Sequence, residues 1–397
     1  MRKLIFVLMA MLLLSSCRSE SEKLTLNVYN WGEYISDGSE ESLNVNEEFE
    51  NYCFDELGME VQVNYTTYAS NEDMYNKIKS GSASYDVIIP SDYMIEKMIA
   101  EDMLLKLDFS NIPNYEYVND SYKNLFFDPN NEYSVPYTCG MVGIIYNEEM
   151  VDEEDIGSWD LLWNEKYKGQ ILQFNNPRDA FGTAIYWAGG SVNDTDVAVW
   201  ESAAEKLKAQ KPLVQSYVMD EIFNKMKNGS AAAAPYYAGD YLTMHDGNES
   251  LKFYYPEEGT NIFVDSMCIP ASARNKELAE IYINFMLSDD IAIANAEYIA
   301  YASPLDNVKN SEVYIEDMLD WNEDVMDVLY PDELGIRTEY FENLDSETLL
   351  LQNGLWETLK IENAVEPWVY ITSSVIILLL AAIMLYNYII KKIRDNY

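Results

Sequence analysis

The stretch LTLNVYNWGEY at residues 24–34 is the starting point for interpreting the whole chain. The alternation over residues 24–28 predicts a first β-strand. Trp31, Gly32 and Tyr34 follow at the point where that strand should end. In open α/β sheets the carboxyl ends of the strands border the crevice that holds a ligand. Aromatic faces attract cations, so this stretch favours a flat or cationic ligand, although the same rings could instead cover the edge of a core.

Predicted strands and helices alternate along the segment that follows. Repeated strand-helix-strand units predict an α/β fold with a mainly parallel sheet and helices on both faces. Strands are predicted over residues 59–65, 85–90, 142–146, 170–174, 251–255 and 262–269, and helices over 42–57, 70–81, 159–167, 196–210, 219–228, 277–287 and 289–298. Residues 133–147 lie between two α/β blocks, which suggests a segment that crosses from one block to the other.

Two acidic residues stand out from this pattern. Asp265 lies inside an apolar strand, where a carboxylate is costly to bury unless it is paired. It is either satisfied by local hydrogen bonds or available to a cation, and we favour the second interpretation. Asp179 lies near the start of a predicted helix, where it could bind a ligand or simply complement the helix dipole.

The composition sets broad limits on function. The chain has 397 residues, enough for two domains with cores of their own. Its 68 acidic and 26 basic residues give a formal net charge of -42. Such a surface argues against nucleic acid as a partner and favours cationic ligands, although acidity could serve solubility alone. The sequence has no CxxC motif, and its single histidine, His245, has no partner at metal-ligand spacing, so no metal or other cofactor is predicted.

The two ends of the chain predict attachment to a membrane. Residues 1–17 have a basic start, a short apolar core and the sequence LSSC, which is typical of a lipoprotein signal peptide with Cys17 as the lipid-modified residue. Residues 367–390 are almost continuously apolar and long enough to span a bilayer as a helix. The basic residues in 391–397 predict a cytoplasmic tail. The body would therefore lie on the extracytoplasmic face of the cell membrane, anchored to it.

Several short motifs recur in the order of one known family. They are YNWGEY at 29–34, SNE at 70–72, PSDY at 90–93, FDPNN at 127–131, WNEKYKG at 163–169 and DS at 265–266. On these motifs residues 24–360 resemble the spermidine/putrescine-binding proteins of bacterial polyamine ABC transporters. The resemblance implies a two-lobe periplasmic-binding-protein fold of type II with a hinge. It also implies a polyamine as ligand, the permease subunits of an ABC transporter as partners, and no enzymatic activity.

The resemblance also assigns lobes and crossing segments. It implies a first lobe of residues 24–137 and 267–308 and a second lobe of residues 138–266 and 309–362, followed by the transmembrane helix. The crossings fall near residues 136–142 and 265–270. Cys139 and Cys268 lie on these crossings, so a disulfide between them is conceivable, although free buried thiols are the favoured state.

The family's ligand-binding residues can be carried over one by one. The aromatic wall maps onto Trp31, Tyr34, Tyr93, Tyr237, Phe263 and Tyr301, a serine maps onto Ser91, the amine-binding acids map onto Asn176, Asp179 and Asp265, and a further polar position maps onto Glu342. Asn176 stands where the family has an acid, Asp179 is shorter than the expected glutamate, and Tyr237 and Phe263 replace tryptophans. The loss of one carboxylate could favour a diamine over a triamine.

Three other classes of function remain open. Paired carboxylates such as Asp179 and Asp265 could serve a carboxylate-dependent hydrolase, although the sequence has no nucleophile or phosphate-loop motif. The same fold could bind another small cation or metabolite, such as iron, thiamine or a sugar. A structural surface protein could also reuse the fold.

Overall fold

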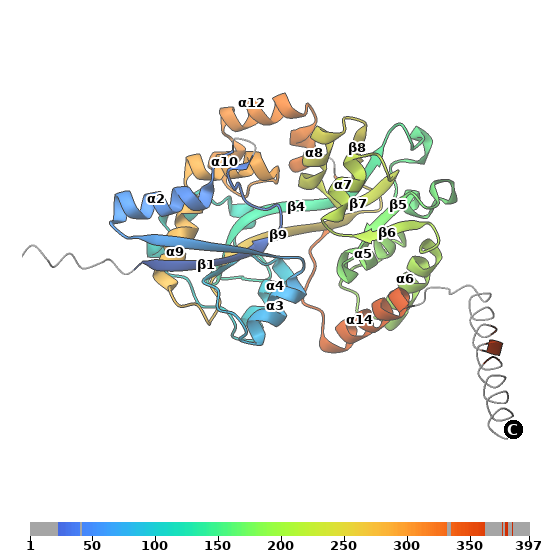
Figure 1. Cartoon of the computed structure of the whole chain (residues 1–397), viewed down its shortest axis with the longest axis horizontal. Helices are drawn as coiled ribbons and strands as arrows, with labels where there is room; N and C mark the ends of the chain where they lie inside the picture. The colour runs from blue at the N-terminus through green and yellow to red at the C-terminus, as the bar shows by residue number, and fades with distance from the viewer. Residues whose placement is uncertain are drawn as a thin grey trace, which may run out of the picture.

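Two long strands, β4 (Ser134–Asn147) and β9 (Thr260–Cys268), connect the two lobes of an α/β protein (Figure 1). The computed structural model describes residues 23–39, 42–331 and 335–361, together with four isolated positions, Val375, Leu378, Leu379 and Ile383. The strands of this described part form one continuous path in the order β2-β1-β3-β9-β4-β7-β5-β6, with β10 beside β9 and β8 beside β4.

The first lobe is built on three parallel strands, β1 (Leu24–Trp31), β2 (Val61–Tyr68) and β3 (Val87–Ile88). Strand β9 enters this sheet antiparallel to β3 and carries the first half of β4 on its other side. Strand β3 is fully buried and β1 has no exposed residue, as expected of parallel strands covered by helices on both faces.

The second lobe repeats this arrangement. Its parallel strands are β5 (Ile171–Phe174), β6 (Val214–Val218) and β7 (Ala233–Tyr237). Strand β4 enters antiparallel to β7 and carries β8 (Leu251–Tyr254) on its other side. In each lobe, therefore, the antiparallel strand comes from a crossing segment. Because β9 pairs with β3, β4 pairs with β7, and the two crossing strands pair with each other, the two lobes share one backbone framework.

The register shows where strand β4 passes from one lobe to the other. Residues 134–141 of β4 pair with β9, with an irregularity between Pro136 and Thr138, and residues 142–146 pair with β7. The short strand β10 (Thr338–Glu339) runs parallel to the start of β9 and returns the chain to this central region. The two crossing strands thus lie side by side in the middle of the molecule (Figure 1).

The helices cover both faces of the sheets, and local sequence signals set several of their ends. Asn44 caps the start of α2 by accepting a hydrogen bond from the amide of Glu47, and Gly58 ends that helix in the left-handed conformation. The helices are α2 (Val45–Leu57), α3 (Asn71–Lys79), α4 (Asp92–Ala100), α5 (Pro177–Trp187), α6 (Val197–Gln210), α7 (Glu221–Lys227), α8 (Ala238–Gly247), α9 (Lys276–Met286), α10 (Asp289–Ile299), α11 (Asp306–Lys309), α12 (Glu312–Trp321), α13 (Val325–Leu329) and α14 (Ser346–Ile361).

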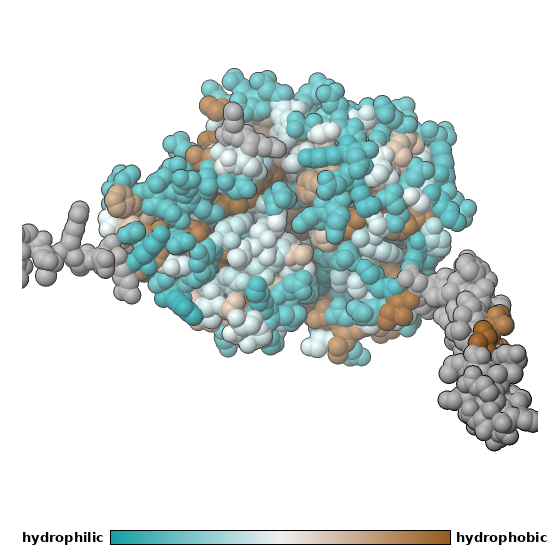
Figure 2. Space-filling view, viewed as in Figure 1, coloured by the Kyte–Doolittle hydropathy of each residue, from teal (hydrophilic) through white to brown (hydrophobic). Residues whose placement is uncertain are grey.

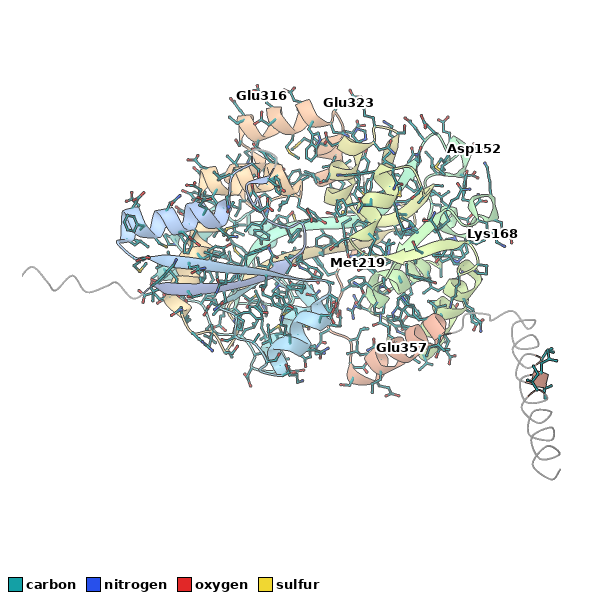
Figure 3. The ribbon with its side chains drawn as sticks, viewed as in Figure 1. Asp152, Lys168, Met219, Glu316, Glu323 and Glu357 are labelled. Carbon is teal, nitrogen blue, oxygen red and sulfur yellow. The ribbon has the colours of Figure 1, made fainter. Side chains whose placement is uncertain are left out.

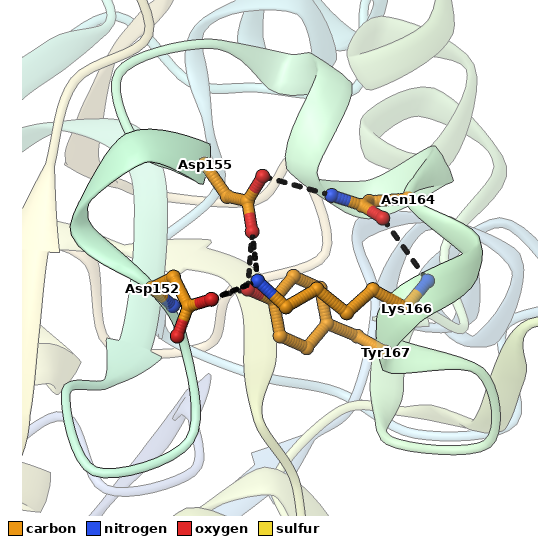
Figure 4. Close-up of polar contacts among 5 residues, drawn as sticks. All are labelled: Asp152, Asp155, Asn164, Lys166 and Tyr167. Carbon is orange, nitrogen blue, oxygen red and sulfur yellow. Dashed lines mark hydrogen bonds and ion pairs between the residues drawn. The ribbon is translucent and has the colours of Figure 1, made fainter.

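The connection from β4 to β5 contains no α-helix and is fastened by side chains instead. The ammonium of Lys166 lies between Asp152 and Asp155, and the hydroxyl of Tyr167 donates to Asp155 at 2.5 Å (Figure 4). Asn164 donates to Asp155 and also accepts from the amide of Lys166. The predicted helix over 159–167 is therefore wrong. Two 3-10 turns stand there, because Asn164 adopts an extended backbone between them and caps the second.

The face of the molecule shown in Figure 2 is predominantly hydrophilic, in keeping with the net charge of -42. Apolar side chains that remain exposed include Leu350 and Ile361 on α14, at 73% and 76% exposure. Within the described residues no helix is both long and apolar enough to cross a bilayer. The predicted signal peptide with Cys17, the tail 391–397 and all but four positions of the predicted span 367–390 lie outside the described residues.

Cys53, Cys139 and Cys268 are all buried free thiols in the described structure. Cys139 faces Val264 across the two crossing strands, whereas Cys268 faces Ser134. The four-residue offset between Val264 and Cys268 corresponds to about 13 Å, well beyond the roughly 7 Å between Cα atoms that a disulfide tolerates. The suggested proximity of Cys139 and Cys268 is therefore wrong, because both lie on neighbouring strands but far apart in register.

Candidate functional site

A cleft lies between the lobes, where the carboxyl ends of the parallel strands of both lobes face each other. It has about 810 Å³ of free space, including space open to solvent. Met219, which follows β6, is one of its lining residues and lies between the two lobes in Figure 3. Ten of the eleven predicted ligand-binding residues line this cleft: Trp31, Tyr34, Ser91, Tyr93, Asn176, Asp179, Tyr237, Phe263, Asp265 and Tyr301.

Asp265 is the buried acid of the central strand β9, with 4% of its surface exposed. Its Oδ2 accepts a hydrogen bond from the hydroxyl of Tyr34 at 2.8 Å. Its Oδ1 is fully buried and meets no donor of good geometry among the described residues. Burial raises the pKa of Asp265 to about 6, and the hydroxyls of Ser91 and Tyr34 oppose this rise. The site therefore contains a carboxylate with one unsatisfied oxygen, which a cationic donor could stabilise.

Tyr34 is held in place from the crossing strand β4. Its hydroxyl lies 2.5 Å from Oγ1 of Thr138, which donates because the Tyr34 proton is directed to Asp265. The ring of Tyr34 also contacts that of Tyr301 edge-on, with centroids 4.8 Å apart. The segment after β1 and the crossing strand β4 thus place the rings of Tyr34 and Tyr301 beside the Asp265 carboxylate.

Asp179 lies in the first turn of α5 in the second lobe. Its Oδ2 accepts from Nδ2 of Asn176 at 2.7 Å and from the hydroxyl of Tyr237 at 2.9 Å. Burial raises the pKa of Asp179 to about 7, while Tyr237 and the neighbouring charge of Arg178 lower it. Asn176 is itself the cap of α5, because its Oδ1 accepts from the amide of Arg178 at 3.0 Å. The neutral residue at 176 therefore has a structural role and also orients Asp179.

Glycines allow the aromatic wall to approach the backbone closely. A Cβ atom at position 140 would lie 2.7 Å from Cζ of Phe263, and one at position 239 would lie 2.5 Å from Cδ2 of Tyr301. The ring of Tyr237 meets that of Phe263 at an interplanar angle of 81°. The rings come from β7, β9 and the segment after α10, so they form a wall only in the folded chain.

Ser91 and Tyr93 begin helix α4 at the tip of β3. Nδ2 of Asn71 donates to the hydroxyl oxygens of both residues at 3.1 Å, and Oδ1 of Asn71 accepts from the amide of Ser91. The Tyr93 hydroxyl in turn donates to Glu72 at 3.1 Å. The SNE motif at 70–72 therefore acts as a support for the PSDY motif at 90–93.

Glu342 is the one predicted residue that does not line the cleft. Its side chain is exposed, its amide donates to Asn193 at 2.9 Å, and its carbonyl accepts from Arg178. The adjacent residue, Phe341, is buried and does line the cleft. The structure does not place the side chain of Glu342 in the cleft, because Phe341 fills that side of the segment and Glu342 faces solvent.

The sequence interpretation missed a group of charged residues in the cleft. They are Glu33, Asp92, Arg178, Asp220 and Asp240. Burial raises the pKa of Asp240 to about 8, the charges of Asp220 and Glu33 add to the rise, and the hydroxyl of Tyr301 opposes it. Burial likewise raises the pKa of Asp92 well above its usual range. All five lie two to four residues after the end of a strand, which was the signal available in the sequence.

Acids outnumber bases in this lining, since six carboxyl groups face one guanidinium. No cluster of three or more metal-ligating side chains is found in the part of the chain that the structure describes. Aromatic rings and buried carboxylates can hold a cation through charge-assisted hydrogen bonds and cation–π contacts. The cleft is thus suited to binding an elongated organic cation.

The chain is thus a two-lobed α/β protein with an acidic and aromatic cleft between the lobes. Residues 82–324 match the family described as bacterial extracellular solute-binding protein, and the chain belongs to that family. The protein is accordingly a solute-binding protein and not an enzyme, and an extracytoplasmic location fits this family.

Curated relatives and solved structures agree with this assignment. The spermidine/putrescine-binding periplasmic protein of Escherichia coli K12 is 36% identical over 281 residues, which are 70% of this chain and 77% of that protein. The putrescine/cadaverine-binding protein of Pseudomonas aeruginosa is 29% identical over 377 residues, 91% of this chain and 99% of that protein. The solved spermidine/putrescine ABC transporter substrate-binding protein PotD of Streptococcus pneumoniae is 35% identical with a TM-score of 0.69, covering 85% of this chain and 99% of that one.

Proposed function

We propose that this protein captures polyamines, putrescine or spermidine, in the interlobe cleft and delivers them to the permease of an ABC transporter. The observation that carries the proposal is Asp265, a buried carboxylate whose Oδ1 is unsatisfied within a cleft walled by aromatic rings. The relatives from Escherichia coli and Pseudomonas aeruginosa, whose names state spermidine, putrescine or cadaverine as ligands, support it.

The chemistry of the ligand matches the chemistry of the lining. A polyamine is a flexible chain of methylenes with ammonium groups at fixed intervals. Carboxylates accept charge-assisted hydrogen bonds from such ammonium groups, and each is worth about 1.5–3 kcal/mol. Aromatic faces cover the methylenes and add about 0.5–2 kcal/mol for each cation–π contact. In this proposal the ligand lies among Trp31, Tyr34, Ser91, Tyr93, Asn176, Asp179, Tyr237, Phe263, Asp265 and Tyr301.

We further propose that the cleft prefers a diamine to a triamine. Asn176 caps α5 and donates to Asp179, so this position offers a neutral amide to a ligand instead of a carboxylate. One ammonium group would then be held by Asp265 and another by Asp179. Putrescine has two such groups, whereas the third group of spermidine has no carboxylate at position 176.

A titration series with the full-length protein in detergent tests these proposals. Putrescine, cadaverine, spermidine and spermine are titrated into the wild-type protein and into Asp265→Asn. The substitution keeps the size of the side chain but removes its charge, so affinity should fall at least about tenfold. Asp55→Asn is the matched control, because Asp55 is exposed on α2, and it should bind like the wild type. Near-native putrescine binding by Asp265→Asn would rule the proposal out.

The two ends of the sequence suggest how the receptor is attached to the membrane. We propose that Cys17 carries a lipid and that residues 367–390 span the membrane, which would hold the receptor beside its permease at a high effective concentration. The lipoprotein named TpPotD from Treponema pallidum, 25% identical with a TM-score of 0.70, supports the lipid anchor. Release of the intact chain from cells without detergent would contradict both anchors.

We also propose that residues 24–137 and 267–308 move as one lobe against residues 138–266 and 309–362. The pairing of β4 with β9 over residues 134–141 supports a hinge within these paired crossing strands. Hinge closure of this kind sequesters a ligand between two rigid bodies.

A further inference from the structure

A third segment connects the lobes across the cleft, in addition to the two hinge strands. Residues 340–344, which we call the strap, follow β10 and lead to α14. In Figure 1 this orange-red segment passes between α4 of the first lobe and α5 of the second. The strap contains neither helix nor strand, and its Phe341 side chain lines the cleft.

The strap is bound to both lobes through its backbone. On the side of the second lobe, Nδ2 of Asn193 donates to the carbonyl of Tyr340 at 2.7 Å, and Oδ1 of Asn193 accepts from the amide of Glu342 at 2.9 Å. On the side of the first lobe, the amide of Asn343 donates to Oε2 of Glu96 in α4 at 2.7 Å. Any opening of the lobes must therefore move the strap or break one of these bonds.

Arg178 is the side chain at which both lobes and the strap meet. It belongs to α5 of the second lobe, and only 4% of its surface is exposed. Its guanidinium carbon lies 4.5 Å from the centroid of Tyr93 in the first lobe and 4.9 Å from that of Phe341 in the strap. An Nη2 hydrogen bond to the carbonyl of Glu342 completes the arrangement. These contacts require the lobes to be closed.

A direct role in holding an ammonium ligand does not explain Arg178, because a fixed cation repels other cations. Its Nε is buried and has no acceptor within the described structure. Burial lowers the pKa of Arg178, and the groups that oppose this are Tyr93, Glu72 and Asp92 of the first lobe and Asp179 of the second. The guanidinium therefore depends on both lobes for the groups that offset its burial, and three of these four move away when the lobes separate.

We propose that Arg178 is an interlobe clamp, whose guanidinium holds Tyr93 and the strap against the second lobe and thereby couples solute binding to closure. The proposal rests on the proposed function only for the identity of the solute. In the open state the guanidinium is hydrated and the strap amides exchange freely. In the closed state the two rings and the Glu342 carbonyl hold it, which slows dissociation of the bound solute.

Hydrogen exchange of the full-length protein in detergent tests the clamp. The exchange rate is measured on the peptide that covers residues 340–344, with and without saturating putrescine. In Arg178→Gln the amide hydrogens of this peptide should exchange at least about fivefold faster than in the wild type, even when putrescine saturates the cleft. Its putrescine dissociation rate should rise at least about tenfold with little change in association. Arg178→Lys keeps the charge but lacks the planar group, so it should keep the wild-type pH profile of binding while its strap exchanges like that of Arg178→Gln.

Each outcome decides one of the two proposals. Equal strap exchange and equal dissociation in Arg178→Gln and the wild type would overturn the clamp. If putrescine does not bind the wild type, the proposed function fails. The comparison of strap exchange without ligand then still tests the clamp, with faster exchange in the variant supporting it and equal exchange overturning it. If Arg178→Gln does not fold, Phe341→Leu replaces it, because it removes the strap ring that the guanidinium contacts, and unchanged strap exchange there would overturn the clamp.

Discussion

Gly140 shows how a single missing side chain shapes the cleft. It pairs with Phe263 across the hinge strands, and the Phe263 ring occupies the space where a Cβ atom would stand. The larger ring of a tryptophan at position 263 would have to fit into the same space beside the backbone of Gly140. The hinge therefore contributes to the wall as well as to the connection between the lobes.

Gly140→Ala should weaken both folding and binding. The added Cβ lies 2.7 Å from Phe263, so the ring must shift, at a cost of about 1–3 kcal/mol in the free energy of unfolding. Putrescine affinity should fall with it, because the ring belongs to the aromatic wall. Thermal unfolding and titration check both effects.

Gly354→Ala is the matched control for this substitution. Position 354 lies inside α14, with no atom within 4 Å of an added Cβ. Alanine is the better helix former, so this variant should be as stable as the wild type or more stable by about 1 kcal/mol. Equal stability of the two variants would contradict the role given to Gly140.

At the scale of the element, the start of α5 combines a cap, a ligand-facing acid and the clamp residue within four positions. Asn176 caps the helix, Pro177 occupies its first turn, and Arg178 and Asp179 point into the cleft. A helix N-terminus also favours negative charge nearby, which partly offsets the burial of Asp179. This compact arrangement explains why a change at position 176 should alter specificity.

Asn176→Asp should shift preference from putrescine towards spermidine. Aspartate caps a helix as well as asparagine does, so α5 should remain intact. The second carboxylate replaces the amide that donates to Asp179, which places two acids side by side and supplies a partner for a third ammonium. We expect spermidine affinity to rise about tenfold relative to putrescine, measured by titration. An unchanged ratio would contradict the proposed link between residue 176 and ligand length.

Many elements could be predicted from the sequence, and two of those that were not, β6 and α4, show the physical reasons. The strands that became β1, β2, β5 and β9 show clear alternation or apolar runs. Strand β6 was missed, because it carries Gln215 and Ser216 and forms only at the edge of a sheet that the rest of the chain provides. Helix α4 was missed because its start coincides with the cleft residues Ser91–Tyr93, which were interpreted as a strand tip.

At the scale of the whole molecule, the burial of acids should make the receptor sensitive to pH. Burial raises the pKa of Asp265 to about 6, of Asp179 to about 7 and of Asp240 to about 8. In the unfolded chain such groups titrate near pH 4. Because the folded-state pKa is the higher one, each group's stabilising contribution is fully present below about pH 4 and is lost as the pH rises through the folded pKa.

We therefore expect the ligand-free protein to lose stability between about pH 5 and pH 8. Putrescine remains a dication over this range, since alkyl amines titrate near pH 10. By holding the carboxylates ionised it should reverse the loss, so its affinity should rise at least about tenfold from about pH 5.5 to pH 8. Thermal unfolding and titration at several pH values check this, and an affinity that stays flat over the range would contradict it.

The sequence by itself determined the family, the α/β class and ten of the residues that line the cleft, because the motifs that carry the resemblance include residues near strand ends, where the cleft forms. Only the tertiary structure decided that Glu342 faces away from the cleft, that Cys139 and Cys268 are out of register, and that Arg178 joins both lobes to the strap. These facts depend on which distant segments pack together and in what register. Local patterns do not encode that information, since a side chain's surroundings at the cleft come from both lobes at once.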